Sequence, residues 1–583
     1  MKYNLAAFNN AVKYYEKALK NYKKKTILVL AHVNNDAAFY SIAPLSRAIH
    51  NLNSDMHVMF HNHDSNMFNI MKDVWDTYAD MKKGVKNQKT MALKDFISIV
   101  DKKAKGEFEK IFPGPDLILN AGKNVFTAPK LIINFRHEWF KKHNWSKLLQ
   151  TAKKIWKQVY DLKKNEKVGF SFELILREKD MELPLEDYLD SYAITRAMFS
   201  TINNTYKVMT AATGRESQLE KGERIGELKA TIIGCELSKD INEPVFKKYK
   251  RLSKLLKLNR IKFTDAVFGI HGKGYAGKHL FGDLIGYPTP NKKSRWSTPS
   301  GILYKFDWYP QTKYDTRDPK TRIAFTETLP IDTFIQTCNI DWLAMQRRND
   351  KIIKVVEKSD KIVVSSRTSN FEVILKGKKG RRHAKGSDVD TRHKYNVDYY
   401  KRTGIKAGTM ANLPGGEAFM TPEYIKGRFY GDVVISIDQS YLLNAKDPLT
   451  IDCDKNGYRI VKGPEKIVNK IKEKKKEAWK RLLEHQKNKS VPKEIINLRK
   501  KNFENIGEFA INTHPTAKLS NYLIVNEKIA NMIHIALGSG FDADKATDYH
   551  YDIVINAKKQ KMDICVVKGK HRQYILKKGK FVV

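Results

Sequence analysis

The chain has 583 residues, 41% of them hydrophobic, which is too long for a single hydrophobic core and predicts two or three domains. Lys and Arg total 107 against 64 Asp and Glu, and the formal net charge of +43 would attract polyanions. Because the lysines are spread along the whole chain, we favour a general lysine bias over a protein dedicated to reading nucleic acid. Four widely separated cysteines argue against a disulfide framework and a thiolate zinc site, and without a run of about 18 apolar residues we expect no membrane span.

The first elements in the chain predict a Rossmann-like domain. Residues 1–25 form an amphipathic, basic helical pattern without the apolar core of a signal peptide, so we expect a cytoplasmic protein. Apolar runs in "KTILVLAHVNND", "DMHVMFHNH" and "PDLILNAG" then predict strands that alternate with helical stretches. This alternation is typical of a parallel sheet covered by helices, and we expect an enlarged α/β domain over residues 1–330 without a dinucleotide.

Residues 265–310 are a Gly- and aromatic-rich insertion in this domain. The stretch "HGKGYAGKH" within it could present backbone amides to a phosphate. It lacks the spacing of a Walker motif and the Ser or Thr after the Lys, so an ordered surface loop is the favoured interpretation.

Residues 464–501 carry apolar side chains at helical spacing among many lysines. This pattern predicts one long helix or a helical hairpin with a basic outer face. The face could be a polyanion-binding arm, but a solvated helix inserted in a catalytic domain is the preferred interpretation.

From Tyr549 onward the hydrophobic pattern changes to a period of two, with Lys-Gly-Lys tips between alternating runs. We expect an antiparallel meander there. His550 and Asp552 are two residues apart on its first strand, so both side chains should leave the same face of the sheet.

Four segments in the last third place metal-ligand residue types in surroundings that predict ordered, mostly buried backbone. Unpaired buried carboxylates would cost several kcal/mol each, so we expect them to be paired or bound to metal. Carboxylates mixed with imidazoles suit Zn²⁺, Co²⁺ or Mn²⁺, and this number of ligands exceeds what one tetrahedral ion needs, which indicates two ions. The residues are Glu417 in "NLPGGEAFMTP", Glu508 in "ENIGEFAIN", Glu527 and His534 in "NEKIANMIHIALGSG", and His550 and Asp552 in "YHYD".

These segments, in this order, resemble the aminopeptidase T and aminopeptidase S family, the thermophilic leucyl aminopeptidases, which are two-metal exopeptidases. "NLPGGEAFMTP" is similar to the family's Asn-Leu-Pro stretch that ends in Glu, an aromatic residue and Thr-Ala-Pro, and "IGEFAI" to its Leu-Gly-Glu strand. "NEKIANMIHIALG" and "YHYD" are similar to its His-Ile-Ala-Leu-Gly and His-x-Asp segments. The resemblance implies an α+β metal-binding domain over residues 401–583, preceded by a family-like connecting helix and strands over residues 331–400.

The resemblance also implies roles for single residues. Glu508 would take a proton from the attacking water, and Glu527 would be a further ligand or an acid/base group. The implied ligands of the two divalent ions are Glu417, Glu508, His534, His550 and Asp552. Members of the family are typically homodimers, and we extend that expectation to this chain.

The sequence departs from the family pattern at three places. Phe541 stands where the family usually has a Tyr that donates to the oxyanion, unless Tyr549 or another donor replaces it. The interval from His534 to His550 is shorter than usual, and the basic helical insertion separates Glu417 from Glu508.

Two interpretations follow. The first is a metal-dependent aminopeptidase that hydrolyses N-terminal residues from peptides through a water bridged by two divalent metals. The alternative is a catalytically impaired metal-binding relative that binds a polyanion such as RNA, with Phe541 as its main support. The ordered ligand set favours the peptidase.

Overall fold

The structure is a computed structural model, and it describes most of the C-terminal half of the chain. Described in the C-terminal part are residues 322–583 except 378–384, 392–409, 488–492, 541–544 and 546. Described before residue 322 are 5–24, 26–32, 44–45, 47–49, 51–61, 117–120, 145–163, 168–172, 185–202, 209–212 and 266–271.

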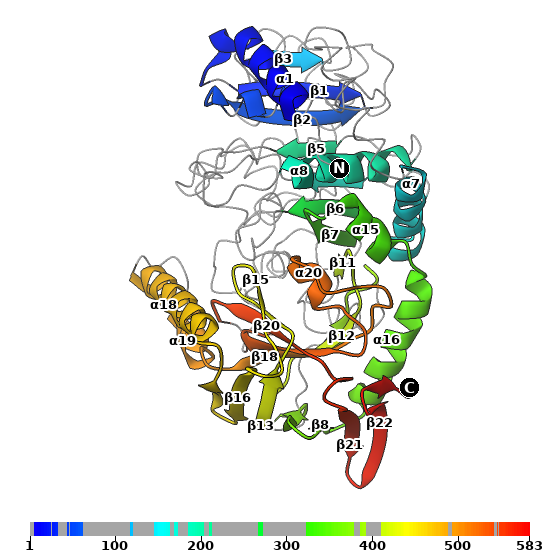
Figure 1. Ribbon diagram of the computed structural model, residues 1–583, viewed down its shortest axis with the longest axis vertical. Coiled ribbons are helices and arrows are strands. Elements are labelled where there is room, and N and C mark those ends of the chain that lie inside the picture. Colours follow the sequence, from blue (N-terminus) through cyan, green and yellow to red (C-terminus); the bar gives the residue numbers. More distant parts are fainter. Residues whose placement is uncertain are drawn as a thin grey trace, which may run out of the picture.

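The strands before residue 328, together with β11, form two four-stranded sheets, shown in blue to yellow-green in Figure 1. In the first, β1 pairs parallel with β2 and β3, and β5 pairs antiparallel with β2. In the second, β4, β6, β7 and β11 pair parallel. The strands are β1 (Thr26–His32), β2 (Asp55–His61), β3 (Leu117–Asn120), β4 (Val168–Phe172), β5 (Met209–Ala212), β6 (Ala266–His271), β7 (Arg322–Glu327) and β11 (Met410–Asn412).

The Rossmann-like sheet that the sequence predicts for residues 1–330 is not seen in the described residues. Their strands fall into two separate short sheets instead of one doubly wound sheet, and one pair runs antiparallel. The alternating pattern predicts strands correctly at residues 26–32, 55–61 and 117–120, but it does not specify which strands pair.

Helices accompany these sheets and lead into the C-terminal half. Helix α7 packs against α8 and α15. Helix α16 begins after Asp341, whose side chain accepts a hydrogen bond from the amide of Ala344, and it runs along the C-terminal sheets in Figure 1. The helices are α1 (Leu5–Ala18), η1 (Lys20–Tyr22), α7 (Trp145–Lys154), η2 (Ile155–Val159), α8 (Leu185–Ser200), α15 (Ile331–Cys338) and α16 (Trp342–Glu357).

Two larger antiparallel sheets dominate the C-terminal half. The eight-stranded sheet has the order β17-β16-β13-β9-β8-β21-β22-β23. Its strands are β8 (Lys361–Ser365), β9 (Asn370–Ile374), β13 (Tyr424–Gly431), β16 (Leu449–Asp454), β17 (Gly457–Lys462), β21 (Asp563–Lys568), β22 (His571–Lys577) and β23 (Lys580–Phe581).

The seven-stranded sheet has the order β10-β12-β18-β19-β20-β14-β15, and all its pairs are antiparallel. Its strands are β10 (Lys385–Ser387), β12 (Glu417–Met420), β14 (Val434–Ser436), β15 (Ser440–Leu442), β18 (Ile506–Asn512), β19 (Ile533–Gly538) and β20 (His550–Ile555). The short helix α20 (Leu523–Asn526) lies between β18 and β19 in the chain.

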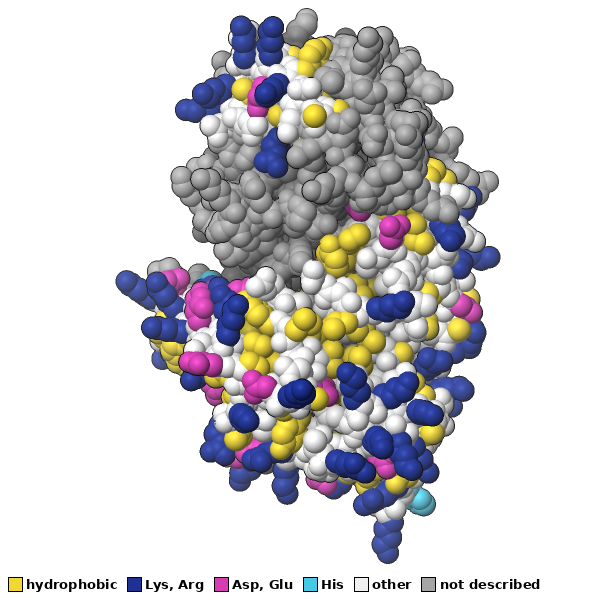
Figure 2. Space-filling view, in the orientation of Figure 1, with side chains coloured by type: hydrophobic (Ala, Val, Ile, Leu, Met, Phe, Trp, Pro, Cys, Tyr) yellow, Lys and Arg dark blue, Asp and Glu magenta, His cyan; other side chains and the backbone are white. Residues whose placement is uncertain are grey.

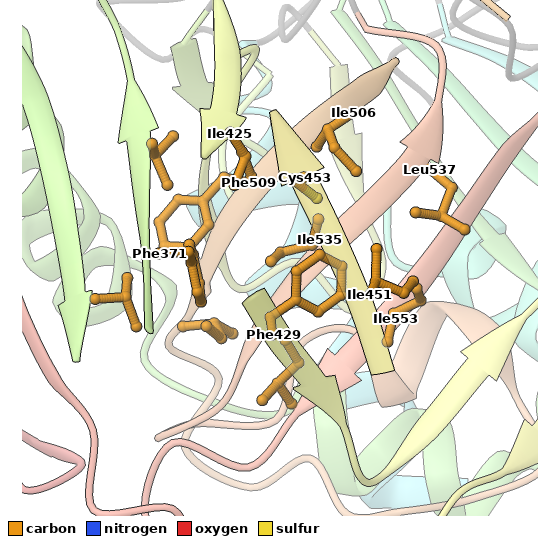
Figure 3. Packing of buried hydrophobic residues seen from close by; sticks show 14 of the residues in the cluster. Phe371, Ile425, Phe429, Ile451, Cys453, Ile506, Phe509, Ile535, Leu537 and Ile553 are labelled. Atoms are coloured by element: carbon orange, nitrogen blue, oxygen red, sulfur yellow. The ribbon is translucent and has the colours of Figure 1, made fainter. Parts of the chain in front are cut away.

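The main hydrophobic core brings side chains of both large sheets together (Figure 3). Phe371 of the eight-stranded sheet lies edge to face against Phe509 of the other, with ring centroids 6.2 Å apart. Ile535 and Ile553 are fully buried in the same core. Because side chains alternate along a strand, the neighbours of these core residues project from the opposite face of the seven-stranded sheet, and that face carries the candidate site.

The predicted meander is confirmed only after residue 562. Strands β21, β22 and β23 pair consecutively, with turns at Gly569 and Gly579, which both have positive φ. Strand β20 belongs to the other sheet, where it pairs with β19 and β14. A period of two shows that a segment is a strand, but it does not identify the partner.

The basic insertion is a helical hairpin, which is one of the two forms that the sequence predicts. Helices α18 (Glu465–Lys487) and α19 (Lys493–Lys501) contact each other. The buried side of α18 contains Ile467, Ile471, Ala478 and Leu482. On the face shown in Figure 2, Lys and Arg are spread over the described surface, which agrees with a general lysine bias. Within the described residues, no helix is both long enough and apolar enough to cross a bilayer.

Candidate metal centre

Four adjacent strands of the seven-stranded sheet carry the predicted ligands. Glu417 lies on β12, Glu508 on β18, His534 on β19, and His550 and Asp552 on β20. In the strand register, Ala536 pairs with Glu508 on one side and with Asp552 on the other. The small Ala536 side chain therefore leaves space between the two carboxylates.

The side chains form two groups with one member in common. In the first, His534 Nε2 lies 3.5 Å from Glu508 Oε1 and 3.6 Å from Glu417 Oε2. In the second, His550 Nε2 lies 3.3 Å from Glu508 Oε2 and 3.0 Å from Asp552 Oδ1. Each oxygen of Glu508 thus faces a different imidazole.

The other ring nitrogen of each histidine is also fixed. His534 Nδ1 lies 2.9 Å from Asn512 Oδ1, and His550 Nδ1 lies 2.9 Å from the carbonyl oxygen of Ser539. Because both partners are acceptors, Nδ1–H donates in each case. The Nε2 atoms are thereby directed at the carboxylates, which is the orientation in which histidines bind metals.

Two glycines explain why the backbone can bring these residues together. Gly507 precedes Glu508 at an irregularity in the β18–β19 register, and a Cβ there would lie 1.8 Å from the carbonyl oxygen of Ser539. Gly416 precedes Glu417 with φ +149°, and a Cβ there would lie 2.6 Å from Cβ of His514. Both positions require glycine because the backbone approaches a neighbour too closely for any side chain.

A buried lysine adjoins the two groups, and the ligand-type pattern in the sequence did not reveal it. Lys528 Nζ lies 2.7 Å from Glu417 Oε2, and 2.9 Å from both Glu527 Oε1 and Asp388 Oδ2. Lys528 is fully buried, and Glu527 is nearly so. Glu527 is outside both groups, and Asp388 comes from the segment after β10.

The histidines have raised pKa values. Burial lowers the pKa of His534, but its hydrogen bond to Glu508 and the charges of Glu417 and Glu508 outweigh burial and raise the pKa to about 9. Burial likewise opposes protonation of His550, yet Asp552 and Glu508 raise its pKa well above the usual value. Without metal, both imidazoles therefore hold protons at neutral pH.

The pKa values of the carboxylates shift in opposite directions in the same environment. Burial dominates at Glu417 and at Glu527, whose pKa rises to about 7 despite the nearby Lys528. Burial also raises the pKa of Glu508 and of Asp552, but the two histidines outweigh it at Glu508 and His550 outweighs it at Asp552, so both pKa values are lowered. Carboxylates of different proton affinity are thus available side by side, a frequent property of catalytic sites.

The donor set fits divalent cations. Carboxylate oxygens and imidazole nitrogens are the ligands that Zn²⁺, Co²⁺ and Mn²⁺ share. Glu417 Oε2 and Asp552 Oδ1 are buried and accept no hydrogen bond of favourable angle, although charged nitrogens lie within 3.0 Å of both. Each group of three side chains could hold a metal ion.

The five predicted ligands are therefore brought together, and metal binding itself stays a prediction.

Phe541 and all but the first residue of "HGKGYAGKH" are outside the described residues. Glycines 272, 274 and 277 in that stretch have the G-x-G-x-x-G spacing and follow the parallel strand β6, and the expected absence of a dinucleotide stays a prediction. Tyr549 is not a replacement donor for the site, because its hydroxyl contacts Tyr458 and the carbonyl of Phe503 in the core.

Comparison with known proteins gives a limited result. No protein-family model and no curated protein matches the chain. Among solved structures, wild-type AmpT from Thermus thermophilus, an aminopeptidase, is similar over 75% of this chain and 99% of its own, with 13% sequence identity and a TM-score of 0.40. A likeness at this level does not establish a function.

Proposed function

We propose that this protein is a metal-dependent aminopeptidase that removes N-terminal residues from peptides. One divalent cation would be held by Glu417, Glu508 and His534, and a second by Glu508, His550 and Asp552. The observation that carries the proposal is the position of Glu508, whose two oxygens face different histidines. A carboxylate shared in this way is suited to joining two neighbouring ions.

The charges of the buried cluster are compatible with two divalent ions. Five carboxylates and one ammonium leave four negative charges, which two divalent cations neutralise when the histidines are uncharged. Without the ions, protons on the two histidines and on the carboxylates of raised pKa compensate this charge, so metal binding would displace protons. The carboxylates are Asp388, Glu417, Glu508, Glu527 and Asp552, and the ammonium is that of Lys528.

The residues around the ions are suited to amide hydrolysis. Zn²⁺, Co²⁺ or Mn²⁺ would supply Lewis acidity, which lowers the pKa of a water and polarises a carbonyl oxygen. Glu527, which lies beside both groups without belonging to either, would accept a proton from water and return it to the leaving amine. Because Glu508 would be a ligand of both ions, we assign the proton transfer to Glu527 instead of Glu508.

Removal of single N-terminal residues agrees with the electrostatics of the site. A free N-terminal ammonium is attracted to a centre rich in carboxylates, whereas a blocked terminus is not. The motif resemblance of Glu417, Glu508, His534 and the His550-x-Asp552 pair to the leucyl aminopeptidases supports the same reaction. We extend the proposal to a homodimer on that resemblance alone.

The test compares substrates that differ only at the amino group. Metal-stripped protein is reconstituted with Co²⁺, Zn²⁺ or Mn²⁺ and assayed on leucyl-p-nitroanilide and its N-acetyl derivative. We expect metal-dependent release from the free amine, none from the acetylated compound, and none with Glu508→Gln. Lys475→Met is the matched control, because Lys475 is a partly buried lysine paired with Glu504 away from the site. Equal cleavage of both substrates would contradict an aminopeptidase.

A further inference from the structure

Lys528 is a fully buried cation enclosed by carboxylates. Its side chain is 1% exposed, and its ammonium lies within 2.9 Å of Asp388, Glu417 and Glu527. Burying an ammonium costs several kcal/mol, and replacing a buried ion pair with packed apolar residues is often neutral or stabilising. A role in stability alone therefore does not account for a lysine at this position.

Asp388 connects Lys528 to the backbone of a metal-group residue. Asp388 Oδ1 accepts hydrogen bonds from the amides of Gly416 and Glu417, at 2.8 and 3.0 Å. Its Oδ2 accepts from Asn412 Nδ2 and lies 2.9 Å from Lys528 Nζ. The backbone and the side chain of Glu417 are thus held by two members of the same ion pair.

The main chain of Lys528 is fixed as well. Its carbonyl oxygen accepts a hydrogen bond from the amide of His514, and His514 packs against Gly416. The His514 ring is itself held by the carbonyl oxygen of Thr337, 2.7 Å from Nε2. Lys528 is therefore anchored at both ends next to Glu417.

We infer that Lys528 is a positioning residue for the metal groups, which holds Glu417 Oε2 and Glu527 Oε1 in place through its ammonium. Glu417 is thereby preorganised as a ligand, and Glu527 is kept beside the groups without joining either. The inference rests on the proposed two-metal site, but it does not require that the protein hydrolyse any substrate.

A positioning role and simple charge compensation predict opposite results when the lysine is removed. If Lys528 only balances charge, its removal makes the site more negative and strengthens metal binding. If Lys528 positions Glu417, its removal weakens metal binding, and loss of such outer partners typically costs about 10–100-fold in affinity.

The test is a cobalt titration of metal-stripped protein, followed by calorimetry and by the visible spectrum of Co²⁺. We expect Lys528→Met to bind at least one equivalent 10-fold or more weakly and to change the spectrum, with Lys528→Arg restoring part of the affinity. Lys475→Met, the matched control, should leave both readouts unchanged. If Lys528→Met does not fold, Lys528→Gln takes its place, and we expect weaker binding there too. Unchanged or tighter binding would overturn the inference alone, whereas a wild-type protein that binds no cobalt would overturn the proposed function itself.

Discussion

Replacement of His534 by Asn tests the charge state of the metal-free site. The Asn side chain can still donate to Asn512 Oδ1, as Nδ1 of the histidine does, but it removes the ring nitrogen that faces Glu417 and Glu508. The folded protein raises the pKa of His534 from 6.5 to about 9, so protonation stabilises the metal-free protein fully below pH 6.5. This stabilisation is lost as the pH rises through 9.

The expected size of this effect follows from the two pKa values. A tenfold change in a protonation equilibrium corresponds to about 1.4 kcal/mol, so the difference between 6.5 and about 9 corresponds to roughly 3 kcal/mol. Between pH 6 and pH 9.5 the metal-free wild-type protein should therefore lose about 3 kcal/mol more unfolding free energy than His534→Asn. Any cavity that the substitution leaves adds the same cost at both pH values and cancels.

Urea unfolding of both metal-free proteins at pH 6, 7, 8 and 9.5 measures this difference. The wild-type protein should exceed the variant by the largest margin at pH 6, and the margin should shrink toward pH 9.5. A margin that is the same at pH 6 and pH 9.5 would show that His534 carries no extra proton in the folded protein, and the reasoning about the site would be refuted.

Three further predictions concern the ligand set and the backbone that holds it. Glu508→Gln should weaken binding of both metal equivalents by more than the 10–100-fold that is typical for loss of a residue behind the ligands. Glu527→Gln should still bind both equivalents but should hydrolyse substrate about 10²–10⁴-fold more slowly. The reverse pattern would exchange the roles of the two residues. Anomalous diffraction from Co²⁺-loaded crystals should show two peaks, one in each group that contains Glu508, and a single peak would contradict the shared carboxylate. Gly507→Ala should lower the unfolding free energy by roughly 1–3 kcal/mol, because its Cβ would overlap the carbonyl oxygen of Ser539; a neutral effect in thermal unfolding would show that this close approach can relax.

The parts of the site that the sequence predicted are those encoded locally. His550 and Asp552 were expected on one face of a strand from their spacing, and their side chains do meet at 3.0 Å. Glu508 and His534 stood out as polar residues in apolar segments, and both are buried beside each other. A polar residue inside a strongly apolar strand is a local signal, so no knowledge of strand pairing is needed to find it.

The parts that were missed depend on pairing between distant segments. Asp388 lies in a polar stretch without a periodic pattern, and only the pairing of β10 with β12 places it against Glu417. Lys528 was hidden by the abundance of lysine in the chain, since nothing local separates a buried lysine from the exposed ones. The same limit applies to β20, whose pattern predicted a strand but not its place in the seven-stranded sheet.

The most direct measurement of the central claim follows leucyl-p-nitroanilide hydrolysis as metal-stripped protein receives Co²⁺ in steps. Two equivalents should bind, and activity should reach its plateau at the second equivalent, because both groups around Glu508 are needed. If two equivalents bind and no aminoacyl-p-nitroanilide is hydrolysed, or if the stripped protein is equally active, a two-metal aminopeptidase is contradicted.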